Sequence, residues 1–185
     1  RNYDNSNKVA SNQRPLLRDS IFDFELFKFL YFNRKPQFNK LEISCYEDVI
    51  LKCVINNAND TLKFLFNELI ENKELCFTAF ENSLRFNHDF AKFMLDFQSN
   101  EDKNDENSSF YFFKENMDFD LYINAVTFYD EDILVKLIQL YGIDAIDFNN
   151  NQEFFVSTLL DELPKKMILR LFDRILPMFP MEICS

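Results

Sequence analysis

The sequence predicts an all-α protein made of stacked helix–turn–helix pairs. Apolar side chains recur at spacings of three and four along most of the 185 residues, and the prolines stand at expected helix boundaries. In addition, one block occurs five times, in which a basic residue stands among four flanking positions, all apolar except Thr61. Its basic residues are Lys28, Lys63, Lys92, Lys136 and Arg170. A recurring block of this kind is typical of stacked structural repeats.

The composition is that of one folded domain. Apolar residues make up 47% of the chain, which contains 24 phenylalanines. Burial of that much apolar surface can offset the entropy that is lost on folding. We therefore expect one continuous domain with a sizeable core.

The N-terminal half is expected to hold a tail and one helical repeat block. Residues 1–19 are polar and of mixed charge, which predicts a tail or a poorly ordered cap. Residues 20–97 form the first helical repeat block. Its expected helices cover 26–30, 49–55 with 61–65, and 75–84 with 90–94.

An acidic polar insert separates the two halves. Residues 98–109 contain no apolar residue, which predicts a loop or a disordered insert. Residues 110–185 form the second helical repeat block, with expected helices over 121–127 with 134–138 and over 154–163 with 168–172.

A turn is expected at a constant offset within four of the repeats. Asn57, Phe86, Asp130 and Pro164 each stand six residues before the basic residue, in or beside a polar or helix-breaking stretch. The alternative is that a helical protein rich in apolar residues carries lysines on its helix faces without any repetition.

Residues 130–144 resemble the second half of an ankyrin repeat. The residues that match the family pattern are Val135, Lys136, Leu137, Gly142 and Asp144. Gly142, the only glycine, falls where that family ends its second helix, at a position that commonly needs a left-handed residue. Residues 49–70, 77–97 and 155–176 are similar more weakly.

The chain also departs from the family pattern. The opening Thr-Pro-Leu-His tetrapeptide and the glycine between the helices are absent. The resemblance therefore implies a degenerate ankyrin-like solenoid with irregular or missing hairpin loops, which binds proteins and has no catalytic centre. A different helical bundle or another helical-pair solenoid remains the alternative.

The scarcity of glycine and histidine excludes several classes of enzyme. A Rossmann fingerprint and a P-loop each need several glycines, and this chain has one. His88 is the only histidine and the four cysteines form no C-x-x-C pair, so no metal site and no cofactor are expected. We expect a protein that is not an enzyme. A hydrolase that uses His88 with a thiol or a carboxylate is the one specific catalytic alternative.

The net charge and the cysteines indicate which partners and which cellular compartment to expect. The net charge of −11 disfavours nucleic acid and anionic lipid as partners, and no apolar run is long enough to cross a membrane. The spacing of the cysteines suggests free thiols in a reducing compartment, and hence a cytoplasmic location.

These features predict a non-catalytic protein–protein interaction module. Residues 41–185 hold 12 basic and 27 acidic residues, so a protein partner with a basic surface is expected. The alternative function is a structural segment or subunit of a larger repeat protein or assembly, with self-association. The candidate partner-binding residues are Phe110, Tyr111, Phe112, Asp144 and Asp147. For the aromatic residues after the insert, packing into the core is the competing expectation.

Overall fold

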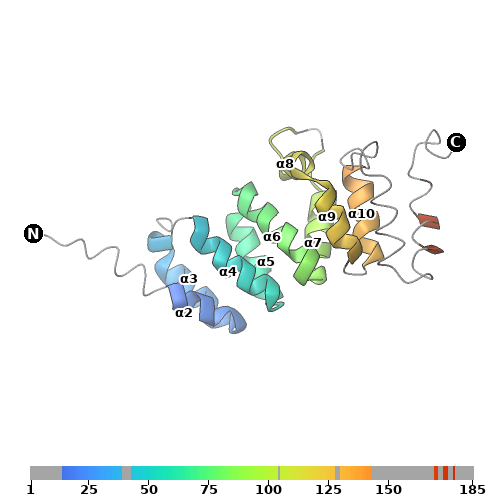
Figure 1. Cartoon of the computed structure of the whole chain (residues 1–185). Coiled ribbons are helices and arrows are strands. Elements are labelled where there is room, and N and C mark those ends of the chain that lie inside the picture. Colours follow the sequence, from blue (N-terminus) through green and yellow to red (C-terminus); the bar gives the residue numbers. More distant parts are fainter. Residues whose placement is uncertain are drawn as a thin grey trace, which may run out of the picture. The chain divides into compact units, whose positions relative to one another are not determined.

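The structure is a computed structural model that describes residues 14–38, 43–103, 105–127, 130–142, 169, 170, 173, 174 and 177 (Figure 1). In these residues the protein is all-helical and contains no strand, which confirms the predicted class. The elements are α2 (Arg14–Asp19), the 3₁₀ helix η1 (Ser20–Phe22), α3 (Phe24–Phe38), α4 (Ile43–Ile55), α5 (Asn59–Leu69), α6 (Lys73–Phe86), α7 (His88–Ser99), α8 (Ser109–Asn116), α9 (Phe119–Thr127) and α10 (Glu131–Tyr141).

The chain divides into two compact units. The first covers Arg1–Phe90 and the second covers Ala91–Ser185, so the boundary falls within α7 and before the acidic insert. The expectation of one continuous domain with blocks at 20–97 and 110–185 stays a prediction.

Helices of the first unit contact the next helix along the chain and also the one after it. Successive contacts join α2 to α3, α4 to α5 and α5 to α6. In addition α2 contacts α4, α4 contacts α6 and α3 contacts α5. The core that these contacts bury includes Leu17, Ile21, Phe27, Val54, Leu62, Leu65, Phe80 and Leu84.

Polar side chains cap the start of two helices in the first unit. Asp23 accepts a hydrogen bond of 3.0 Å from the backbone N–H of Leu26 and caps α3. Asn72 caps α6 in the same way. Such caps satisfy N–H groups that have no partner inside the helix.

Asn87 joins three elements of the first unit. Its backbone N–H donates to Ser83 at the end of α6, and its side-chain oxygen accepts from the N–H of Phe90 in α7. Its side-chain amide also donates to Asn59 at the start of α5, over 2.7 Å. Asn87 is buried, so this complete set of hydrogen bonds offsets the loss of its contacts with water.

In the second unit, α9 packs against α10, and both ends of α10 are set by local chemistry. Asp130 caps its start by accepting from the backbone N–H groups of Asp132 and Ile133. Gly142 ends it with a φ of 81° and donates its N–H to Ile138 over 2.9 Å. The expectation that the only glycine provides a positive φ at this helix end is confirmed.

The predicted helical segments 49–55, 61–65, 75–84, 90–94, 121–127 and 134–138 all lie within helices, namely α4, α5, α6, α7, α9 and α10. The expected pair over 154–163 and 168–172 falls mostly outside the described residues. The predicted turn at Asn57 is present, and Asn57 itself takes a positive φ of 54° between α4 and α5. Asparagine tolerates this conformation better than most residues.

Some expected boundaries differ in detail. Within the predicted tail, residues 14–19 form α2, and residues 1–13 lie outside the described part of the chain. Pro36 lies inside α3, where the sequence predicts a boundary. The helix ends two residues later, so it does not continue beyond the turn that contains the proline. Of the helices described, none is long and apolar enough to cross a membrane.

Candidate functional site

The residues proposed from the sequence as aromatic anchors lie on α8, and the structure separates them. Phe110 is buried and stacks on Tyr141 of α10, with ring centroids 5.4 Å apart. Phe113, one turn later, is fully buried. Phe110 therefore follows the core-packing alternative, and together with Phe113 it fixes α8 to the second unit.

Tyr111 and Phe112 occupy other positions on the same helix. Both side chains are half-buried, so part of each ring remains accessible to solvent. Ser108 caps α8 by accepting from the N–H of Tyr111 over 3.2 Å, which fixes the first turn. The capped helix thus carries two aromatic side chains that are only partly buried.

The acidic insert is tied together where it joins α7 and α8. Gln98 is buried and donates a hydrogen bond of 3.1 Å to the hydroxyl of Ser109. That hydroxyl in turn donates to Glu101 over 3.2 Å. Residues 98 and 99 complete α7, residue 109 begins α8, and hydrogen-bonded turns lie in between.

Six exposed carboxylates lie near Tyr111 and Phe112 in the sequence. They come from the insert, from α8 and from the segment that leads into α9, and are Asp102, Asp105, Glu106, Glu115, Asp118 and Asp120. The exposed basic residues of the same stretch are Lys103 and Lys114. We call Tyr111, Phe112 and these six carboxylates the α8 surface. Its excess of negative charge attracts cationic groups.

The other candidate residues, Asp144 and Asp147, lie outside the described residues. Their role in partner binding stays a prediction.

The recurring basic residues of the second unit form ion pairs between neighbouring segments, a role that the sequence analysis missed. Lys92 of α7 lies 2.7 Å from Asp130, the cap of α10. In a second pair the lysine belongs to α10 and the carboxylate to α7: Lys136 pairs with Asp96. The sequence spacing could have indicated such pairs, because Asp96 follows Lys92 by four residues and so lies on the same helix face.

Two arginines further along the chain also form ion pairs with the start of α10. Arg170 lies 3.8 Å from Glu131, and Arg174 lies 2.8 Å from Asp132. The hydrogen bond from Arg174 lowers the pKa of the Asp132 carboxyl below its ordinary value. At Lys92, Lys136 and Arg170 the recurring position is thus used for contacts between segments of the protein itself, whereas Lys28 pairs with Glu25 within α3.

The thiols of Cys53 and Cys76 are buried and not joined to another cysteine. Burial raises the pKa of each thiol to about 12, so both stay protonated at neutral pH. A protonated thiol is a poor nucleophile, and neither cysteine is suited to catalysis with His88, which begins α7. The described residues contain no group of three or more side chains arranged to hold a metal ion.

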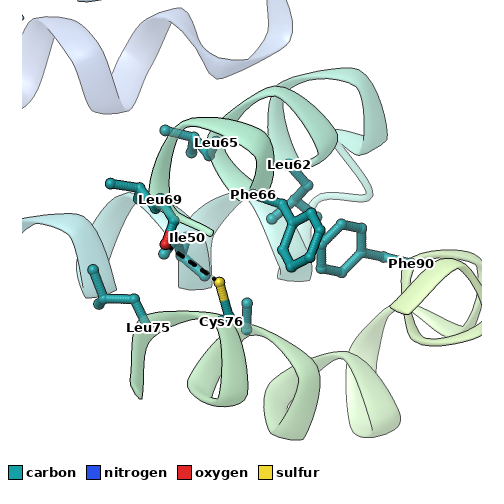
Figure 2. Close-up of a pocket in the computed structure, with 9 residues that line it drawn as sticks. Ile50, Leu62, Leu65, Phe66, Leu69, Leu75, Cys76 and Phe90 are labelled. Atoms are coloured by element: carbon teal, nitrogen blue, oxygen red, sulfur yellow. Dashed lines mark hydrogen bonds between the residues drawn. The ribbon is translucent and has the colours of Figure 1, made fainter. Parts of the chain in front are cut away.

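A small cavity lies in the core of the first unit (Figure 2). It is lined by side chains of α4, α5 and α6 together with Phe90, and its volume is about 10 Å³. Across it the thiol of Cys76 points to the carbonyl of Leu69, over 3.5 Å. A cavity needs at least about 10–15 Å³ to hold a single water, so this one is a packing gap and not a ligand site.

No model of a known protein family, no curated protein and no solved structure shows significant similarity to the chain.

Proposed function

We propose that the chain is a non-catalytic protein–protein interaction module whose α8 surface holds a protein partner with a basic surface. The observation that carries the proposal is the setting of Tyr111 and Phe112. Both are half-buried on a helix that the buried Phe110 and Phe113 anchor, and six exposed carboxylates lie near them in the sequence. Aromatic side chains supply much of the binding energy of interfaces, and complementary charge speeds encounter and selects the partner.

The pattern of helix contacts supports a degenerate ankyrin-like solenoid as the scaffold. In the first unit, α2 contacts α4, α4 contacts α6 and α3 contacts α5, as in stacked pairs. In the second unit, Gly142 ends α10 as the resemblance implies. A stack of this kind holds a binding surface on rigid elements. The unpaired thiols of Cys53 and Cys76 support a reducing, cytoplasmic compartment.

The second candidate function is a structural subunit of an assembly. The exposed apolar side chains of α3 favour it, since a large apolar patch marks an interaction site. A monomeric binder and a self-associating subunit are distinguished by the dependence of molecular mass on protein concentration.

The proposed function is tested by affinity capture on the immobilised full chain, from lysate of the cells that express it, at low and moderate salt. Two variants are compared with the unchanged protein, Tyr111→Ser/Phe112→Ser and Asp102→Asn/Asp105→Asn/Glu106→Gln. We expect one basic protein to be retained by the unchanged chain. Either variant should reduce its retention by about tenfold or more, and moderate salt should reduce it further.

The matched control is Glu71→Gln/Glu74→Gln, which removes exposed carboxylates of the first unit. All variants must first show an unchanged thermal melt. Equal retention of the partner by the α8-surface variants and by the control would overturn the assignment of this surface, as would retention that does not depend on salt.

A further inference from the structure

The helix α3 is apolar on opposite sides. On one side Phe27 and Tyr31 are buried, and the rings of both contact Phe64 of α5 in edge-to-face pairs. On the other side large apolar residues are exposed, namely Phe22 of η1 (67%) and Leu26 (45%) and Phe29 (63%) of α3. Phe32 is 50% exposed as well, although its ring also contacts Phe64 in an edge-to-face pair. We call these four residues the outer α3 face. A helix with apolar residues all round is typically buried on all sides.

The register of the recurring block indicates what kind of neighbour this face fits. Leu26 stands two residues before the basic position and Phe29 one residue after it, with Lys28 between them. In α5 the same two positions hold Thr61 and Phe64.

Both of these α5 residues face the preceding helices. Thr61 is buried and donates its hydroxyl to the carbonyl of Ile21 over 3.0 Å. The ring of Phe64 packs against Phe27 and Tyr31 of α3. Leu26 and Phe29 thus occupy positions that, one pair later, receive another helix, yet in the described part of the chain they are exposed.

The corresponding positions of later helices follow the same rule. In α7 Phe90 is buried and Phe93 is half-buried, and in α10 both Leu134 and Leu137 are buried. Among these residues, only those of α3 are exposed at the two positions of the block.

The size of the face suits the apolar centre of a dimer interface. With about 200 Å² for each large side chain, the exposed fractions give roughly 450 Å² of apolar surface. Specific interfaces bury about 800 Å² per partner, of which somewhat more than half is apolar. The outer α3 face with a polar rim reaches this size.

The rim is self-complementary in charge. Glu25 and Lys28 stand next to Leu26 and Phe29 in the sequence and form an ion pair of 3.5 Å within α3, with side chains that are 81% and 35% exposed. When two copies of one helix pack antiparallel about a two-fold axis, residue i of one faces residue j of the other, and the reverse holds as well. Such an arrangement centred on the outer α3 face brings each Glu25 near the Lys28 of the other copy.

We propose that the outer α3 face is the interface of a homodimer, in which α3 of one copy packs antiparallel against α3 of a second copy. This interface lies in the first unit, whereas the α8 surface lies in the second, so the two proposals stand on different residues.

The test is sedimentation equilibrium of the full chain from about 1 to 100 μM, where a weak dimer shows a concentration-dependent mass. We expect the unchanged protein to dimerise and Phe29→Asp to raise the dissociation constant by about 100-fold or more, because a carboxylate would be buried without a partner. The matched control is Phe86→Asp, since Phe86 is 48% exposed in the same unit but lies outside the face. The control should leave the dissociation constant within about twofold.

Charge reversal tests the antiparallel register separately. Glu25→Lys and Lys28→Glu should each weaken the dimer, and the double variant should restore it, because the cross-pairs are re-formed with exchanged signs. A protein that stays monomeric throughout the concentration range overturns the proposal, and so does a dimer that Phe29→Asp leaves intact. Should Phe29→Asp lower the melting temperature, Phe29→Ser and the charge-reversal series decide the question.

Discussion

The hydroxyl of Thr61 in α5 donates a buried hydrogen bond of 3.0 Å to the main-chain carbonyl of Ile21, forty residues earlier. Thr61 is the one residue that departs from the apolar pattern of the recurring block, and this bond gives the reason. The carbonyl of Ile21 lies in η1 and has no hydrogen-bond donor within this short helix. The hydroxyl of Thr61 supplies that donor from α5.

Replacement of Thr61 with Val should lower the free energy of unfolding by about 1–3 kcal/mol, because the carbonyl of Ile21 would be left buried without a donor. Thr61→Ser retains the hydroxyl and should cost less. Urea denaturation of both variants checks this. The interpretation is wrong if Val is tolerated as well as Ser.

Asp130 combines a helix cap with an ion pair to Lys92, and two substitutions separate these roles. Asp130→Asn keeps an oxygen that can cap α10 but loses the charge, so we expect a loss of up to about 1 kcal/mol. Asp130→Ala loses both and should cost about 1–2 kcal/mol.

Thermal and urea unfolding of the two variants, each also combined with Lys92→Met, measures the contribution of the pair. If Asn is as destabilising as Ala, the cap contributes little and the charge dominates.

Gly142 has a φ of 81° and a ψ of −176°, a combination that only glycine adopts without strain. Gly142→Ala should therefore lower the free energy of unfolding by about 1–3 kcal/mol. Gln139→Ala, at an exposed position of α10, is the control and should change stability by less than about 0.5 kcal/mol. Equal effects of the two substitutions in urea denaturation would contradict the strain argument.

The buried thiols of Cys53 and Cys76 predict a loss of stability at alkaline pH. Their pKa is raised from an ordinary value of 9.0 to about 12, so above pH 9 the unfolded chain loses protons that the folded chain keeps. The contribution is fully present below pH 9 and is lost between pH 9 and about 12, with a slope of up to about 1.4 kcal/mol per pH unit for each thiol.

Urea denaturation from pH 8 to 10.5 measures this slope, and Cys53→Ala/Cys76→Ala should flatten it. Burial also raises the pKa of Tyr31 and Tyr141, so a residual slope above pH 10 is expected in that variant. The explanation fails if the double variant keeps the full slope between pH 9 and 10.

The sequence by itself determined the helical class and the positions of most helices, because apolar periodicity, caps and a lone glycine act over a few neighbouring residues. Gly142 is an example, since its need for a positive φ follows from the end of α10 alone. The helix over 61–65 and the turn at Asn57 were predicted on the same local grounds.

Only the tertiary structure decided which side chains are available for binding. Phe110 and Tyr111 are adjacent in sequence and equally aromatic, yet Phe110 is buried against Tyr141 while Tyr111 stays half-exposed. The pairing of Lys92 with Asp130 and the exposure of Phe29 on α3 likewise depend on which helix lies alongside. The physical reason is that burial and charge pairing are set by residues distant in sequence, and a local pattern gives the face of a helix but not its neighbour.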